Sequence, residues 1–227
     1  MTEAPAPAGG VMGEIDLGGY ISKAWKVWTA DLVLFVVGYL IVLAIILGSM
    51  IVIIGPIFVA GPLVIGYIRV VQKRMNGEPA AIGDIFAGFK EFSRGLVFML
   101  LLVLIALAVT IPLMIVAFVL SWIPCLGQIV TFALQIAVSL GLQTLLFFAW
   151  PLVALSENTP MDCIKKSINF GLAHFWPLLI LSFVTGLISG AGSIAFCVGV
   201  VFSASLAIVI NLVAYKEFYL PKSQPAA

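Results

Sequence analysis

Residues 95–156 read GLVFMLLLVLIALAVTIPLMIVAFVLSWIPCLGQIVTFALQIAVSLGLQTLLFFAWPLVALS and contain no Asp, Glu, Lys, Arg or His. Two further uncharged runs, Leu32–Ile68 and Phe175–Tyr215, lie before and after this stretch. A helix needs about 20 apolar residues to cross the hydrocarbon core of a bilayer, so each run is long enough for two crossings. The three runs predict an all-α, polytopic membrane protein with six transmembrane helices.

The composition places the chain in the membrane class and excludes a nucleic-acid binder. Hydrophobic residues make up 63% of the 227 residues and charged residues only 9%, whereas soluble domains average about a quarter charged residues. The formal net charge is +1, and no dense basic patch is present that could release many counterions from DNA or RNA.

The middle run is the one that could hold either two or three crossings. Its stretch from Ser121 to Gln128 combines Pro124 with Gly127 and divides the run into halves of similar length, which favours two. Three crossings would also place Lys165 and Lys166 outside the cell, against the positive-inside tendency. We therefore predict six spans and both termini in the cytoplasm of a bacterium, with the protein in the inner membrane. Turns are expected near Gly48–Pro56, Ser121–Gln128 and Ser189–Ser193.

An amphipathic segment precedes each pair of spans. Apolar side chains recur at helical spacing in 17–28, 82–92 and 161–172, with charged side chains on the opposite face. Thr159 and Pro160 mark the start of the third helix as N-cap and first helical residue. Such helices lie in the headgroup plane or pack on the bundle, and both alternatives are open. The candidate face for lipid or a partner comprises Lys23, Trp25, Lys26, Trp28, Phe86, Phe89, Lys90, Arg94, Lys165 and Lys166.

These segments predict an internal repeat within a single membrane domain, 15–220. Each unit reads as an acidic residue, an amphipathic helix, an outgoing span, a turn and a returning span, and Asp16, Asp84 and Asp162 open the three units. Because every pair of spans keeps the same orientation, the units should be related by a pseudo-threefold axis along the membrane normal. The expected units are 15–77, 78–158 and 159–220, between a disordered N-terminal tail, 1–14, and a C-terminal tail, 221–227.

Short motifs give the chain a resemblance to a known group. They are Ala24-Trp25, Gly61-Pro62-Leu63-x-x-Gly66, Asp84-x-Phe86-x-Gly88-Phe89, and Ser167 in the third amphipathic segment. The chain resembles a broad, largely uncharacterised family of bacterial six-span membrane proteins that includes the membrane portion of some glycerophosphodiester phosphodiesterases. The resemblance covers nearly the whole chain and implies a polytopic inner-membrane protein. No phosphodiesterase domain is present, so that activity is not implied.

The spans contain uncharged polar residues but no ionisable group, so the sequence offers no catalytic residue, metal ligand or cofactor site. His174 stands beside aromatic residues at the start of a span, where an interfacial structural role is expected. Gln135, Ser139 and Gln143 recur at four-residue spacing on one stripe of a span, and Asn211 lies on the sixth span. Such groups join helices through hydrogen bonds or line a polar path for a solute or lipid, and both alternatives stay open.

The leading functional hypothesis is a non-enzymatic inner-membrane protein that acts through lipid or protein contacts, in envelope maintenance or as the membrane partner of a complex. The alternative is a transporter or channel-like protein whose polar path runs near Gln135, Gln143 and Asn211. Membrane lipids are the expected partners, with another membrane or cytoplasmic protein as a further one. The sequence does not identify the ligand or the oligomeric state.

Overall fold

The computed structural model describes residues 16–51, 55–123, 126–194 and 196–223, and these residues form helices joined by short connections. The predicted tail 1–14 lies outside the described residues. Within the described ranges six helices are long and apolar enough to cross a membrane, which confirms the predicted all-α, six-span class. The helices are α1 (Leu17–Ala30), α2 (Leu32–Ser49), α3 (Gly55–Met75), η1 (Ile82–Glu91), α4 (Phe92–Leu120), α5 (Leu126–Leu145), α6 (Ala149–Leu155), α7 (Pro160–Ala173), α8 (Phe175–Ile194), α9 (Phe196–Ala214), η2 (Tyr215–Tyr219) and α10 (Leu220–Ser223). The last of these extends into the range predicted as the C-terminal tail.

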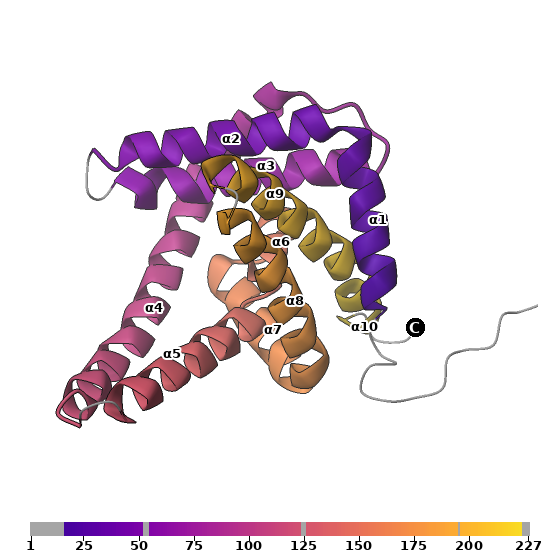
Figure 1. The fold of residues 1–227 in the computed structure, drawn as a ribbon. Coiled ribbons are helices and arrows are strands. Elements are labelled where there is room, and N and C mark those ends of the chain that lie inside the picture. Colours follow the sequence, from indigo (N-terminus) through magenta and orange to yellow (C-terminus); the bar gives the residue numbers. More distant parts are fainter. Residues whose placement is uncertain (1–15, 52–54, 124–125, 195, 224–227) are drawn as a thin grey trace, which may run out of the picture.

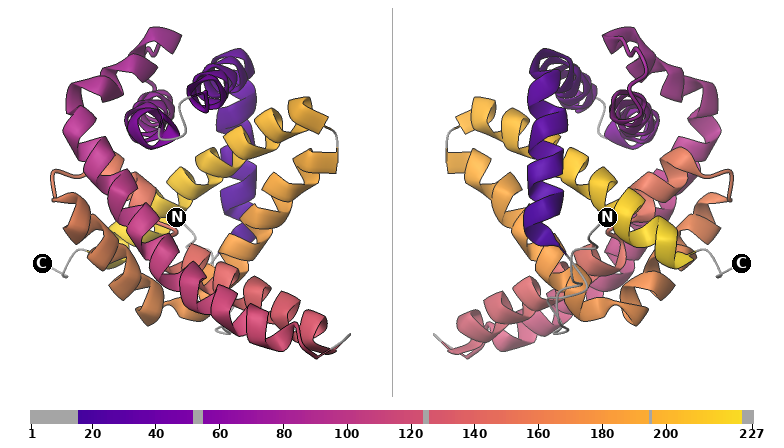
Figure 2. Two further views of the ribbon diagram at one scale, coloured as in Figure 1. Left: turned by 90° about the vertical axis from the view of Figure 1, so that its left-hand side faces the viewer. Right: turned by 90° about the vertical axis from the view of Figure 1, so that its right-hand side faces the viewer.

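The spans form three hairpins, α2–α3, α4–α5 and α8–α9, and their contacts close a ring. Helix α3 packs on α4, α5 packs on α8, and α9 packs on α2. In each case the returning helix of one unit meets the outgoing helix of the next. Figures 1 and 2 show the hairpins pointing in different directions, with the far part of α4–α5 well away from the other two. This cyclic order is the one that the predicted threefold repeat requires.

The amphipathic segments follow the same cyclic rule. Helix α1 packs on α9, η1 on α3, and α7 on α5 and α6, so each lies against the returning span of the preceding unit. Small residues sit at the centre of these contacts, and Ala24, Gly88 and Ser167 are all buried. Part of each apolar stripe therefore packs onto the bundle, and the rest is exposed: Trp25, Phe86, Phe89, Phe92, Met161 and Leu172.

The acidic residue that opens each unit stabilises the start of its amphipathic helix. Asp16 accepts a hydrogen bond from the backbone nitrogen of Gly19 at 2.8 Å. Asp84 accepts from the nitrogen of Ala81 at 3.2 Å. The hydroxyl of Thr159 accepts a hydrogen bond from the backbone N–H of Asp162 at 3.3 Å and donates one to the Asp162 carboxylate at 2.6 Å, which confirms Thr159 as the N-cap. These contacts satisfy backbone donors that the first helical turn leaves unpaired.

The second amphipathic segment is a 3₁₀-helix, whereas the sequence predicts α-helical periodicity there. This segment approaches α3 closely. A Cβ built on Gly66 would lie 1.8 Å from the carbonyl oxygen of Ile85, and one built on Gly88 would lie 2.0 Å from that of Pro62. The sequence motifs Gly61-Pro62-Leu63-x-x-Gly66 and Asp84-x-Phe86-x-Gly88-Phe89 thus meet in one backbone contact. Phe92, predicted on the apolar stripe of this segment, and Arg94, predicted on its opposite, charged face, belong to the first turn of α4.

The third turn also differs from its predicted place. Residues 189–193 were expected to form it because they are rich in Gly and Ser, but α8 continues to Ile194. Gly192 is needed for contact between helices instead, since a Cβ there would lie 2.3 Å from the carbonyl oxygen of Gly199 on α9. Small residues let two helices approach closely in a membrane, and here that role outweighs their tendency to form turns.

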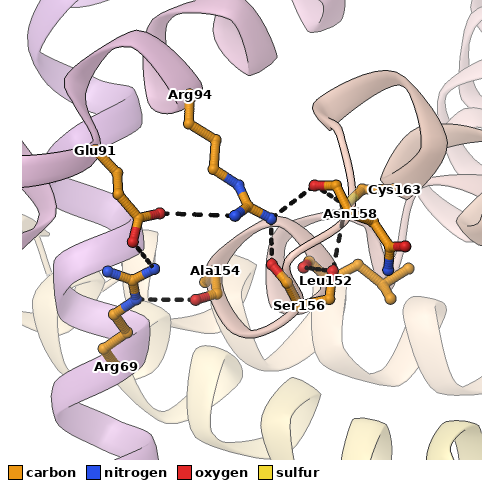
Figure 3. A network of polar contacts seen from close by, with 8 residues as sticks. All are labelled: Arg69, Glu91, Arg94, Leu152, Ala154, Ser156, Asn158 and Cys163. Carbon is orange, nitrogen blue, oxygen red and sulfur yellow. Dashed lines mark hydrogen bonds and ion pairs between the residues drawn. The ribbon is translucent and has the colours of Figure 1, made fainter.

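A network of charged groups fastens the C-terminal end of α6 (Figure 3). Arg69 donates to the carbonyl oxygen of Ala154 at 2.9 Å and binds Glu91 at 2.7 Å. Arg94 donates to the carbonyl oxygens of Ser156 and Asn158. Cations suit the end of a helix because its last carbonyl groups have no partners in the helix and carry a partial negative charge. Arg94, predicted on the face for lipid or a partner, is therefore directed into the protein.

Candidate functional site

A cavity of about 520 Å³ lies at the centre of the ring of hairpins. Each of the six spans contributes to its wall, because residues of α2, α3, α4, α8 and α9 line it together with the broken span formed by α5 and α6. The lining residues are Tyr39, Val64, Ile68, Leu102, Gln143, Leu146, Phe147, Ala149, Trp150, Pro151, Thr185, Ser189, Ala204, Ala207, Ile208, Asn211 and Leu212.

The wall is mostly apolar, with a few polar side chains. The polar groups are the amides of Gln143 and Asn211 and the hydroxyls of Tyr39, Thr185 and Ser189. Among the described residues that line the cavity, none is charged. A largely apolar cavity of about 300–1,000 Å³ with a small number of polar groups is typical of a site for a small molecule.

Asn211 is held in place by a break in the neighbouring span. Pro151 has no N–H group, so the carbonyl of Phe147, four residues earlier, lacks its helical partner. The chain is non-helical between the end of α5 at Leu145 and the start of α6 at Ala149. The side-chain nitrogen of Asn211 donates to the free Phe147 oxygen at 2.8 Å. Asn211 therefore links α9 to the break between α5 and α6 through a hydrogen bond, which is the first of the two predicted alternatives. It also lines the cavity.

Gln143 reaches the cavity from α5. Its side-chain amide lies against Gly186 of α8, with Nε2 3.7 Å from the position of a Cβ on that glycine. The next residue, Thr144, links α5 to α8, because its hydroxyl forms a buried hydrogen bond of 2.8 Å with the hydroxyl of Ser182. The position of Gln143 thus depends on a small neighbour and on a fixed contact between the two helices.

The structure divides the predicted polar stripe. Gln143 and Asn211 line the central cavity, but Gln135 does not. Gln135 borders a separate cavity of about 280 Å³ with Gln128 and Thr131, between α4 and α5. Ser139 is exposed and donates to the carbonyl oxygen of Ile136 in its own helix. The four residues therefore do not line one continuous path.

Tyr39 and Ser189 also line the cavity, although the sequence does not predict them as site residues. Tyr39 lies on α2, whose apolar residues surround the helix on all sides, so periodicity could not indicate its inward face. Ser189 was assigned to a turn. The polar character of Tyr39 and Ser189 could have indicated their position, since a polar side chain within a span usually faces the protein interior.

The predicted face for lipid or a partner is partly exposed and partly used within the protein. Trp25, Lys26, Phe86, Phe89, Lys90 and Lys165 are exposed. Trp28 is buried, because its indole donates to Ser205 of α9 at 2.9 Å. Two exposed lysines bind within the chain: Lys23 binds Glu217 at 2.8 Å and Lys166 binds the side chain of Asn158 at 2.9 Å. The first set is available to face lipid headgroups, and Lys23 and Lys166 are also at the surface.

His174 lies in an aromatic cluster at the start of α8. Its ring stacks on Phe170 with centroids 4.5 Å apart and meets Phe218 edge-on at 5.6 Å. Across the part of the chain that the structure describes, no group of three or more His, Cys, Asp or Glu residues is arranged to hold a metal ion. The contacts give His174 a packing role at the junction of α7, α8 and η2.

Comparisons with protein-family models, with curated proteins and with solved structures gave no match for this chain.

Proposed function

We propose that this protein binds a membrane lipid in its central cavity and acts without catalysing a reaction. The observation that carries the proposal is the lining of the cavity: six spans contribute, the wall is mainly apolar, and the polar groups there are uncharged. An acyl chain is as apolar in the bilayer as against this wall, so the apolar lining accommodates the chain without a large hydrophobic gain. The amides of Gln143 and Asn211 offer hydrogen bonds to an ester or hydroxyl group.

The cellular setting is part of the same proposal. The motif resemblance to bacterial six-span proteins leads us to place the protein in the inner membrane, with both termini in the cytoplasm. Exposed Trp25, Phe86 and Phe89 beside Lys26 and Lys90 support a charged side that rests at the headgroup layer. A lipid-binding role in envelope maintenance follows from these assignments.

The proposal is tested by filling the cavity. Ala207→Trp places a large side chain on α9 where a small one lines the wall. The purified wild type should retain lipid in native mass spectrometry, and the variant should lose most of it. Val116→Trp is the matched control, because Val116 lies on α4 with 42% of its surface exposed and lines no cavity described above.

Ala204→Phe provides a second filling variant in case the tryptophan prevents folding, which a thermal melt in detergent would reveal. Equal lipid retention by the wild type and by a folded cavity-filling variant would contradict the proposal.

Transport of a small polar solute is the second candidate, because Gln143 and Asn211 do line one cavity. It requires a path across the membrane. Solute uptake by proteoliposomes that is lost in Gln143→Leu would favour transport, whereas lipid retention without any uptake would favour the binding role.

A further inference from the structure

A second cavity, of about 450 Å³, lies on the charged side of the protein. Its lining shares no residue with that of the central cavity. Charged and amide side chains predominate, and residues at the C-terminal end of α6 complete the wall. The lining residues are Arg69, Gln72, Lys73, Asn76, Glu78, Glu91, Arg94, Ala154, Leu155, Ser156 and Glu157.

The two cavities follow one another along the same helices. On α3, Val64 and Ile68 line the central cavity, whereas Gln72 lines the charged one, as does Asn76 just after the end of the helix. Residues four apart lie on one face of a helix, so a single face of α3 passes from apolar to polar. Ile68 and Gln72 are separated by about 6 Å along the helix axis.

Helix α6 repeats this arrangement. Pro151 lines the central cavity, and Ala154 and Leu155, one turn further on, line the charged one. An amphipathic molecule lying along α3 and α6 would therefore meet an apolar wall with one end and a charged wall with the other.

The second cavity has equal numbers of cationic and anionic side chains, but not all of them form ion pairs. Three cations, Arg69, Lys73 and Arg94, face three anions, Glu78, Glu91 and Glu157. The single carboxylate of Glu91 is shared between the two arginines, at 2.7 Å from Arg69 and 3.8 Å from Arg94 (Figure 3). Lys73 binds Asp84, which lies outside the cavity lining, at 3.1 Å. The exposed carboxylate of Glu157 has no ion pair within the described residues.

We infer that the charged cavity receives a zwitterionic headgroup, one with a phosphate and an ammonium group, of the lipid whose chain occupies the central cavity. This inference rests on the proposed lipid-binding function. The phosphate lies beside Lys73 and Arg69, and the ammonium beside Glu157. Contacts between opposite charges of this kind are the strong ones among hydrogen bonds, and a net-neutral cavity favours a headgroup that is itself neutral overall.

The test compares three lipids that share their acyl chains: phosphatidylethanolamine, phosphatidylglycerol and diacylglycerol. Each is titrated into the purified full-length protein and measured by native mass spectrometry. The wild type should prefer phosphatidylethanolamine over each of the others by about tenfold, the effect of one charge-assisted contact.

Two variants separate the two ends of the headgroup. Glu157→Gln should remove the preference for phosphatidylethanolamine over phosphatidylglycerol, because it removes the partner of the ammonium group. Lys73→Gln should weaken both phospholipids relative to diacylglycerol. Lys222→Gln is the control, since Lys222 is exposed and lines neither cavity.

The outcomes distinguish failure of this inference from failure of the proposed function. Equal binding of all three lipids that is still lost in Ala207→Trp would overturn the headgroup assignment and leave lipid binding in place. Absence of binding for all three would overturn both. Displacement of lipid by free phosphoethanolamine at the same concentration would assign the charged cavity to a soluble zwitterion and would also overturn the inference.

Discussion

Two glycines determine how closely η1 approaches α3. At Gly66 and Gly88 an added Cβ would overlap a backbone carbonyl of the other helix, and backbone cannot rotate away as a side chain can. Gly66→Ala and Gly88→Ala should each destabilise the protein by about 1–3 kcal/mol, the usual cost of overpacking, or more. Thermal unfolding in detergent measures the loss.

Gly83→Ala is the matched control for this prediction. Gly83 lies in the same 3₁₀-helix, and no atom lies within 4 Å of a Cβ built there. Its substitution should leave the melting temperature nearly unchanged. Alanine has a higher helix propensity than glycine, so propensity cannot explain a loss of stability at either position. Equal destabilisation by Gly83→Ala and Gly88→Ala would contradict the role assigned to the contact with α3.

Asn211 gives a second prediction at the same scale. Asn211→Leu should destabilise the protein by about 1 kcal/mol, typical of a hydrogen bond between membrane helices. Pro151→Ala supplies an N–H group for the Phe147 carbonyl, so the double variant Asn211→Leu with Pro151→Ala should recover part of the loss. Unfolding measurements on the four proteins of this cycle should give a clear coupling energy; strict additivity would argue against the assigned role.

The sequence could identify Asn211 as a polar group within a span, but it could not identify its partner. The sequence associated Asn211 with Gln135 and Gln143 only as residues of a polar path, one of the two alternatives. The actual acceptor is the backbone oxygen of Phe147, which becomes available through the proline four residues later. A pattern search restricted to polar side chains does not detect such an acceptor.

Helix α1 illustrates what the pattern of an element does and does not reveal. Its spacing correctly predicts an amphipathic helix, yet apolar periodicity alone does not say whether lipid or protein covers the stripe. The buried hydrogen bond from Trp28 to Ser205 assigns that stripe to α9, while Trp25, one turn earlier on the helix, keeps 52% of its surface exposed.

Labelling of single cysteines tests this orientation of α1. In a background without the native cysteines, Lys26→Cys should react rapidly with a water-soluble maleimide. Ala24→Cys should react at least tenfold more slowly, because Ala24 is fully buried against the bundle. Comparable rates at both positions would indicate that α1 lies free at the surface.

The segments 82–91 and 189–193 show where prediction at the element scale failed. Both hold glycines, which sequence rules read as weak points of a helix or as turn formers. In the structure the glycines serve contacts between distant segments, η1 with α3 and α8 with α9. Local rules cannot anticipate a contact whose second partner lies elsewhere in the chain.

At the scale of the whole molecule, the uncharged runs were sufficient to predict six spans and three hairpins. They were not sufficient to predict the cavity. Helices α2 and α4 are apolar on all sides, so no periodicity distinguishes the face that meets lipid from the face that meets protein. The cyclic contacts of α3 with α4, α5 with α8 and α9 with α2 supply that information.

The predicted topology has a direct test. In the cysteine-free background, Gln128→Cys, at the start of α5, should be labelled in intact cells by a reagent that does not cross the membrane. Lys165→Cys on α7 should be labelled only after the cells are opened. Labelling of Lys165→Cys in intact cells would reverse the assigned orientation of the protein.

The central claim is that lipid occupies the cavity between the six spans. A cryo-electron microscopy structure of the full chain in nanodiscs made with native lipid extract tests it most directly. Our account predicts elongated acyl-chain density between Gln143 and Asn211, continuing along α3 toward the charged cavity. A cavity that holds only water, or one closed by side chains, would contradict it.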